Sequence, residues 1–288
     1  MSTAPRFAAP GTVDEAVDLL REEGALALSG GTSLALLLGQ GLIEPNALVW
    51  LGRIPELRRV TDAGDHLRIG ATVTLREVAR HPAVRSALPA LARAAGHVGN
   101  PRIRAVATVG GALAHADPRQ DLPPALVALD ATLVTRGPTG FRTLPIGDLA
   151  TGWMETALHA GELITEVRVP IVAETRSVYL RYTPGSAADY PTVGAAAAVT
   201  RGEDRAVAAA RLALAGVGPT VVDVLEAASL AGHGDPPPEA IAAVASAAAS
   251  RAHPVGDRLG TAGYKRAMAA VWARRALAAC LDRQAPVL

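Results

Sequence analysis

The chain has 288 residues, which is enough for one large domain or two of ordinary size. Its 28 basic and 27 acidic residues leave a net charge of +1, so no long-range field of one sign forms and nucleic acid is not expected as a partner. A single cysteine, Cys280, excludes both an intrachain disulfide framework and a cysteine-ligated iron–sulfur cluster.

Local sequence predicts the surroundings of Cys280 and the location of the protein. The surrounding ALAACLDR reads as a helix, in which Cys280 is expected to be a small buried hydrophobic residue. The first residues lack the basic start and apolar run of a signal peptide, and no stretch of about 18 apolar residues predicts a membrane-spanning helix. The cytoplasm is the expected location.

In the first half, strands and helices alternate irregularly. Apolar periodicity and turn residues predict helices at 12–23, 34–38, 74–79, 84–95 (with Pro89 as a break) and 122–129. They predict strands at 25–28 (buried), 47–51, 57–61, 66–69, 131–136, 141–145 and 163–169, with a loop at 96–104.

In the second half, strands come first and helices follow, which indicates a separate α+β domain. Strands are expected at 177–182, 192–200 and 206–215, the last two forming an antiparallel hairpin through the turn at 201–204. Helices are expected at 221–231, 238–251 and 262–281, with a loop at 232–238.

The first notable motif, which we call the first glycine turn, is SGGTS at residues 29–33, between a strand and a helix. Paired glycines permit positive φ and close approach of a ligand to the backbone, and successive amides in such a turn form an anion site. Thr32 and Ser33 add hydroxyl donors for phosphate oxygens. An ordinary tight turn with a helix cap explains the same residues.

The second glycine turn, TVGG at residues 108–111, again combines a hydroxyl with two glycines, after an apolar strand. Ten residues beyond it, Asp121 precedes an apolar helix, where it is either an N-cap or an acceptor for ribose or ribityl hydroxyls. Two such turns suggest a split pyrophosphate clamp, which differs from the absent GxGxxG and GxxxxGK[ST] fingerprints.

Several longer strings, in the same order along the chain, resemble the sequences of FAD-binding medium subunits of molybdenum hydroxylases. These are the hydroxylases of the xanthine dehydrogenase and aerobic carbon monoxide dehydrogenase type. The similarity covers nearly the whole chain. It is carried by ALSGGTSLALLL, LGRIPEL, RIGATVTLREV, ATVGGALAHADPRQDLPPALVALDA, GELITEVRVP, ADYPTVGAAAAV and GYKRAMAAVWARRAL.

The resemblance implies an α+β fold with a vanillyl-alcohol-oxidase-type (PCMH-type) FAD-binding domain and a C-terminal α+β domain with a three-stranded antiparallel sheet and helices. The expected boundaries are 1–172 for the first domain, with subdomains of about 1–54 and 55–172, and 173–288 for the second. FAD would lie between the subdomains, with its pyrophosphate on the two glycine turns.

Cofactor contacts are also implied by the resemblance, without a covalent link to FAD. They are assigned to Ser29, Gly30, Gly31, Thr32, Ser33, Leu34, Thr108, Val109, Gly110, Gly111, Ala112, Asp121, Ile164, Arg181 and Tyr190. In the carbon monoxide dehydrogenase branch of the family, an aromatic at the position of Tyr190 stacks near the isoalloxazine ring. Ile164 falls near a position that contacts the adenine side. A packed strand residue and a solvated charge remain alternatives for Tyr190 and Arg181.

Three departures from the family pattern weaken individual contacts without removing the motif. The second loop of the family usually ends in Asn or Asp, where this chain has Ala112, and usually starts with Gly, where it has Ala107. After the first loop, basic residues of the family are replaced by Gly39-Gln40-Gly41.

The implied activity is that of an oxidoreductase subunit that performs electron transfer. A large subunit carrying molybdenum cofactor and a small subunit with two [2Fe–2S] clusters would be its partners, in a dimer of heterotrimers, with the complex at the inner face of the membrane as an option. FAD here would pass electrons to an external acceptor, and no residue is assigned as catalytic or as a metal ligand. A stand-alone FAD-dependent oxidase and a flavin-free binding protein remain alternatives.

Overall fold

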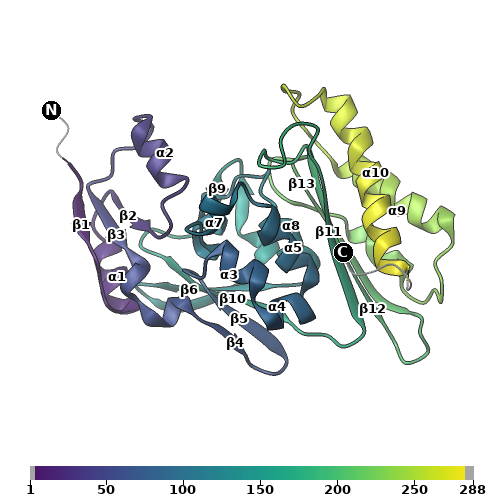
Figure 1. The fold of residues 1–288 in the computed structure, drawn as a ribbon, viewed down its shortest axis with the longest axis horizontal. Coiled ribbons are helices and arrows are strands. Elements are labelled where there is room, and N and C mark those ends of the chain that lie inside the picture. The colour runs from purple at the N-terminus through teal and green to yellow at the C-terminus, as the bar shows by residue number, and fades with distance from the viewer. Residues whose placement is uncertain (1–3, 283–288) are drawn as a thin grey trace.

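In the computed structural model, which describes residues 4–282, three sheets succeed one another along the long axis of the molecule (Figure 1). The first sheet is parallel, in the order β1-β3-β2. Helix α1 (Val13–Leu20) packs on it and is capped by Thr12, and α2 (Leu34–Gly39) follows the first glycine turn. The strands are β1 (Arg6–Ala8), β2 (Ala25–Leu28) and β3 (Ala47–Trp50).

The second sheet has five strands in the order β4-β5-β10-β6-β7, all antiparallel to their neighbours. Its strands are β4 (Val60–Asp62), β5 (His66–Gly70), β6 (Thr132–Gly137), β7 (Gly140–Pro145) and β10 (Leu163–Pro170), and a small hairpin joins β8 (Ala150–Gly152) and β9 (Glu155–Thr156). The helices of this part are α3 (Leu75–Arg80), α4 (Pro82–Ala87), α5 (Pro89–His97), α6 (Pro101–Arg104), α7 (Val109–His115) and α8 (Leu122–Ala128).

The third sheet is antiparallel, in the order β11-β12-β13-β14, and helices cover both of its faces. Helix α10 packs on one face with α9 beside it, and α5 and α8 pack on the other (Figure 1). These elements are β11 (Thr175–Tyr182), β12 (Val193–Arg201), β13 (Val207–Ala215), β14 (Val222–Asp223), α9 (Pro238–Arg251) and α10 (Ala262–Leu281).

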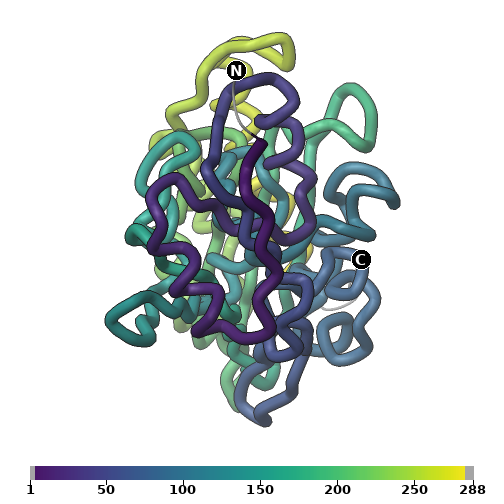
Figure 2. The backbone as a smooth tube through the Cα atoms, turned by 90° about the vertical axis from the view of Figure 1, so that its left-hand side faces the viewer, coloured from purple at the N-terminus to yellow at the C-terminus, as the bar shows by residue number. Residues whose placement is uncertain are grey.

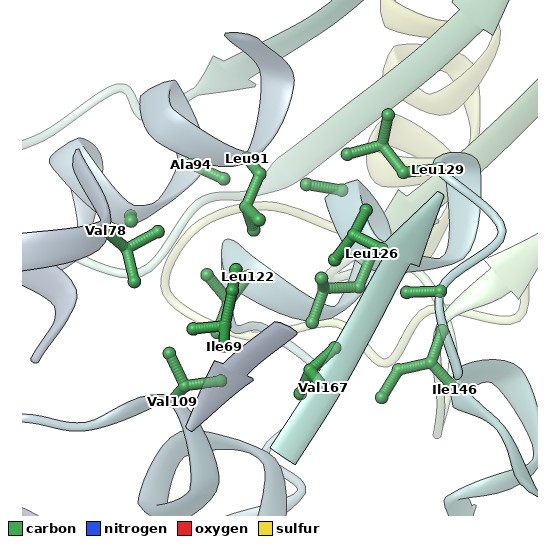
Figure 3. Close-up of a cluster of buried hydrophobic side chains, with 14 of the residues drawn as sticks. Ile69, Val78, Leu91, Ala94, Val109, Leu122, Leu126, Leu129, Ile146 and Val167 are labelled. Atoms are coloured by element: carbon green, nitrogen blue, oxygen red, sulfur yellow. The ribbon is translucent and has the colours of Figure 1, made fainter. Parts of the chain in front are cut away.

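One core joins the second and third sheets. Its side chains, among them Ile69, Leu91, Leu126 and Val167 in Figure 3, come from helices α3, α4, α5, α7 and α8 and from the five-stranded sheet. Residues of β11, β12 and β13, including Tyr179, belong to the same cluster. The view along the long axis shows the purple N-terminal sheet in front of these layers (Figure 2).

Several expectations hold at the level of elements. Helices α9 and α10 have the predicted ends, Pro89 separates α4 from α5, and the hairpin predicted through the turn at 201–204 forms. Cys280 is buried, and its thiol donates to the Ala197 carbonyl, as expected for a small hydrophobic residue in a helix. No helix within residues 4–282 is long and apolar enough to cross a membrane, and the cytoplasmic location stays a prediction.

Other expectations are wrong in detail. Strand β2 is an edge strand with exposed residues, whereas a buried strand was predicted, because β3 occupies the centre of the sheet. The strand predicted at 57–61 begins only at Val60, since Pro55 starts a 3-10 turn (Pro55–Arg58). The loop predicted at 96–104 contains α6, in which Asn100 caps the turn.

The C-terminal sheet has one strand more than predicted. Residues 221–231 were expected to be helical, but they form β14 followed by a 3-10 helix (Leu225–Leu230). The β-branched run of Thr220, Val221 and Val222 favours the extended backbone that pairs with β13.

Candidate cofactor site

The first glycine turn presents backbone amides that the protein itself does not use. The N–H groups of Gly30, Gly31, Thr32 and Ser33 donate to no acceptor within residues 4–282. Gly31 has φ +72°, a value that glycine adopts without strain, and the Ser33 side chain makes no capping bond to α2. Four free amides and a free hydroxyl in one bend fit an anionic group such as a pyrophosphate.

The second glycine turn has a different structure from the one predicted. It does not follow a strand; Thr108 caps α7, and both glycines lie in the first turn of that helix. The amides of Val109, Gly110, Gly111 and Ala112 are all bonded within the protein. This turn therefore offers an exposed glycine surface at Gly111 and the Thr108 hydroxyl proton, but no unused amide.

The fold brings the two turns into direct contact. A Cβ atom added to Gly30 would lie 1.8 Å from the carbonyl oxygen of Val106, so only glycine allows the first turn to pack on the segment before Thr108. The second turn is itself fixed by the β5–α3 connection, since Gly110 N donates to Ala71 O at 2.8 Å and Val109 N donates to Val73 O at 3.0 Å. The two distant motifs therefore lie in contact, and their joint binding of a pyrophosphate stays a prediction.

Asp121 lies in a buried polar cluster between the second and third sheets. It makes no capping bond to α8, so the N-cap explanation is wrong. Tyr179 Oη donates to Asp121 Oδ1 at 2.6 Å, and Arg181 Nε lies 3.5 Å from the same oxygen, an ion pair without a hydrogen bond. Burial raises the pKa of Asp121 to about 6, although Arg181 and the Tyr179 hydroxyl oppose this shift.

Arg181 is not a solvated charge. Its side chain is 7% exposed, and its guanidinium donates to the backbone carbonyls of His97 (2.8 Å) and Asp189. His97 closes this side of the cluster as a neutral ring, because burial and neighbouring arginines lower its pKa to about 4. Arg181 therefore ties the end of α5 to the segment that carries Tyr190.

Tyr190 and Ile164 have contrasting surroundings. Tyr190 lies between β11 and β12, outside any strand and 42% exposed, so the packed-strand explanation is wrong. Ile164 is buried in β10 next to a β-bulge. Leu34, the first residue of α2, is half-buried.

Sequence reasoning missed three residues of this region. Tyr179 is the buried partner of Asp121, and Asp117 and Arg119 form an ion pair beside Tyr190. Asp117 and Arg119 stand in the ADPRQD string between the second glycine turn and α8, so their position next to a ligand motif was a usable signal. Nothing in the spacing of Tyr179 pointed to Asp121.

Comparison with known proteins assigns both halves of the chain. Residues 3–172 match the family described as the FAD binding domain in molybdopterin dehydrogenase, and residues 179–280 match the carbon monoxide dehydrogenase flavoprotein C-terminal domain.

Similar full-length proteins include two named medium chains or subunits. The carbon monoxide dehydrogenase medium chain of Hydrogenophaga pseudoflava is 35% identical over 97% of this chain and 98% of its own length. The nicotine 6-hydroxylase medium subunit of Paenarthrobacter nicotinovorans is 30% identical over 95% and 96% of the two chains.

Solved structures agree in fold. A chain of carbon monoxide dehydrogenase from Hydrogenophaga pseudoflava superposes with a TM-score of 0.92, at 35% identity and with 97% of this chain and 98% of that chain covered. A chain of quinoline 2-oxidoreductase from Pseudomonas putida 86 gives 0.89 at 28% identity, with 98% of each chain covered. The chain therefore belongs to the FAD-binding medium subunits of the molybdenum hydroxylases, and its cofactor is FAD.

Proposed function

We propose that this chain is the electron-transfer subunit of a molybdenum-containing hydroxylase or dehydrogenase complex. The observation that carries the proposal is the set of four unused amides of the first glycine turn, packed directly against the second turn. Bound FAD supplies the redox chemistry, accepting electrons and passing them on, while the protein supplies position and electrostatics.

The proposed partners are a large molybdenum-binding subunit and a small subunit with [2Fe–2S] clusters, assembled as a dimer of heterotrimers. The support is that similar proteins are named medium chains or medium subunits, including those of carbon monoxide dehydrogenase, nicotine 6-hydroxylase and glyceraldehyde dehydrogenase. Electrons would enter from the iron–sulfur subunit and leave to an external acceptor.

The proposed FAD contacts fall into two groups. Residues 29–34 would hold the pyrophosphate through amides and hydroxyls, with Thr108 and Gly111 closing the other side and Asp121 accepting from the ribityl chain. The remaining proposed contacts are Val109, Gly110, Ala112, Ile164, Arg181 and Tyr190. We also propose that the domains divide at 172/173, which the two matched ranges support.

Flavin titration of the full chain tests this function. Gly31→Val places a β-branched residue at φ +72°, where its Cβ would approach Leu28 at 3.3 Å, so we expect purified apoprotein that no longer binds FAD. The matched control is Gly64→Val at φ +93° on the β4–β5 turn, which has comparable strain in open space and should retain FAD.

Three outcomes would contradict the proposal. A wild-type protein that remains colourless with excess FAD would favour a flavin-free binding protein. Equal FAD affinity in the Gly31→Val and wild-type proteins would refute the phosphate clamp. Purification of the native protein without two further chains, one of them bearing molybdenum, would favour a stand-alone oxidase.

A further inference from the structure

The aromatic ring of Tyr190 lies against a guanidinium that the proposed cofactor contacts do not include. Arg119 Cζ is 4.8 Å from the centroid of the Tyr190 ring and 5.9 Å from the Trp153 ring. Trp153 lies in the β8–β9 turn and Tyr190 between β11 and β12, so Arg119 joins two separate segments. A cation held over a ring face restrains the ring in position and orientation.

Asp117 fixes the guanidinium. Arg119 Nε and Nη2 each lie 3.2 Å from one of its two carboxylate oxygens, and the Arg119 amide donates to Oδ1 at 2.9 Å. The Asp117 side chain is 6% exposed and directly follows the left-handed Ala116 that ends α7. Because α7 begins at the second glycine turn, the position of Arg119 is set by that turn's own helix.

The backbone beside Tyr190 is held by a second arginine, Arg181 on β11. The Arg181 guanidinium donates to the carbonyls of Asp189 and Ala187, and to that of His97 on α5. The Tyr190 side chain nevertheless keeps 42% of its surface exposed. The tyrosine thus has one ring face occupied by a cation, an anchored backbone and surface still open to a ligand.

We propose that Arg119 is a positioning residue, which holds one face of the Tyr190 ring so that the other face meets the isoalloxazine ring of FAD. This inference rests on the proposed function. A cation on one face and an aromatic system stacked on the other are compatible, since each interaction uses a separate face of the ring. Asp117 acts in two ways, because it keeps the fork of Arg119 in place and accepts a hydrogen bond from the Tyr190 hydroxyl itself.

Fluorescence of bound FAD tests the inference, because a tyrosine stacked on the isoalloxazine ring quenches it. Tyr190→Ala should raise the fluorescence per bound FAD relative to wild type. Arg119→Ala should raise it partway, since losing the cation–π contact weakens the stacked arrangement about two- to five-fold. Arg119→Lys, which keeps the charge, should return the signal toward wild type. Asp117→Asn should raise the fluorescence, because it loosens Arg119 and weakens the hydrogen bond to the Tyr190 hydroxyl.

A matched control and a double variant separate this role from general destabilisation. Arg136→Ala removes a comparable contact, 5.4 Å over Phe141 on the β6–β7 hairpin, and should leave the fluorescence unchanged. The double variant Arg119→Ala/Tyr190→Ala should match Tyr190→Ala alone, because the ring that Arg119 is proposed to hold against FAD is already absent.

Wild-type fluorescence in Arg119→Ala beside raised fluorescence in Tyr190→Ala would overturn the inference. So would a double variant brighter than Tyr190→Ala. Flavin content is measured separately from its absorbance, so a wild-type protein without FAD would refute the proposed function, and this inference with it, in a recognisably different way.

Discussion

At the scale of single residues, the buried Asp121 makes the folding stability of the protein depend on pH. Its folded-state pKa of about 6 lies above its ordinary 3.8. Between pH 3.8 and pH 6, Asp121 is therefore protonated in the native protein and ionised in the unfolded chain. Stability from this residue is therefore present in acid and is lost as the pH rises through this window, by about 3 kcal/mol at neutral pH.

Asp121→Asn should remove this pH dependence while keeping a hydrogen-bond partner for Tyr179. Between pH 4 and pH 7 we expect the wild-type apoprotein to lose about 2 kcal/mol of unfolding free energy relative to the variant. Urea denaturation at both pH values measures it. If the two proteins keep a constant difference, Asp121 is already ionised at pH 4 in the native state.

Ala112 is a second single residue whose substitution is expected to preserve or raise FAD affinity. It is half-buried beside the exposed Gly111, and its side chain lacks the polar group that the family usually carries there. Ala112→Asn should therefore keep or tighten FAD binding, which isothermal titration measures. A marked loss of affinity would show that FAD meets the second turn elsewhere.

At the scale of elements, the cap of α7 also builds the second glycine turn. Thr108 Oγ1 accepts from Gly111 N at 3.3 Å, so Thr108→Ala should cost about 1 kcal/mol of stability and also weaken FAD binding. Thr12 caps α1 with nearly the same geometry, 3.2 Å to Glu15 N, away from the glycine turns. Thr12→Ala should show the loss of stability alone.

Denaturation curves and FAD titrations of both variants decide between the two roles of Thr108. Thr108→Ser, which retains the hydroxyl, should restore both properties. If Thr108→Ala binds FAD as tightly as Thr12→Ala does, Thr108 serves only as a helix cap.

At the scale of the whole molecule, the shared core predicts one cooperative unfolding transition. Leu126 on α8 packs in the cluster that includes Tyr179, whereas Leu230 packs in the cluster on the other face of the third sheet. Either leucine changed to alanine should cost about 2–5 kcal/mol and lower the midpoint for the entire chain.

The three tryptophans allow this to be measured in each half separately. Trp50 and Trp153 report on the flavin-binding half and Trp272 reports on α10. When the tryptophans of one half are replaced, the remaining fluorescence follows the unfolding of the other half. Two different midpoints in either leucine variant would show that the halves unfold independently.

Most of the local elements, but not those at 57–61, 96–104 and 221–231, follow from patterns of neighbouring residues. Helix α10 lies at 262–281 as predicted, and Thr12 and Thr74 cap their helices, because periodicity and capping involve residues only a few positions apart. The two glycine turns left an ordinary tight turn as an alternative, and the longer strings that resemble the family assigned FAD.

How these pieces meet depends on the packing of the folded chain. It packs Gly30 on Val106, uses the amides of the second turn internally, gives Asp121 to Tyr179 instead of to a helix cap, and places Arg119 on Tyr190. Except for the amide hydrogen bonds of the second turn, these contacts join residues that are separated by about sixty to eighty positions in the sequence. Their geometry depends on how the sheets and helices pack in space, which no pattern of neighbouring residues encodes.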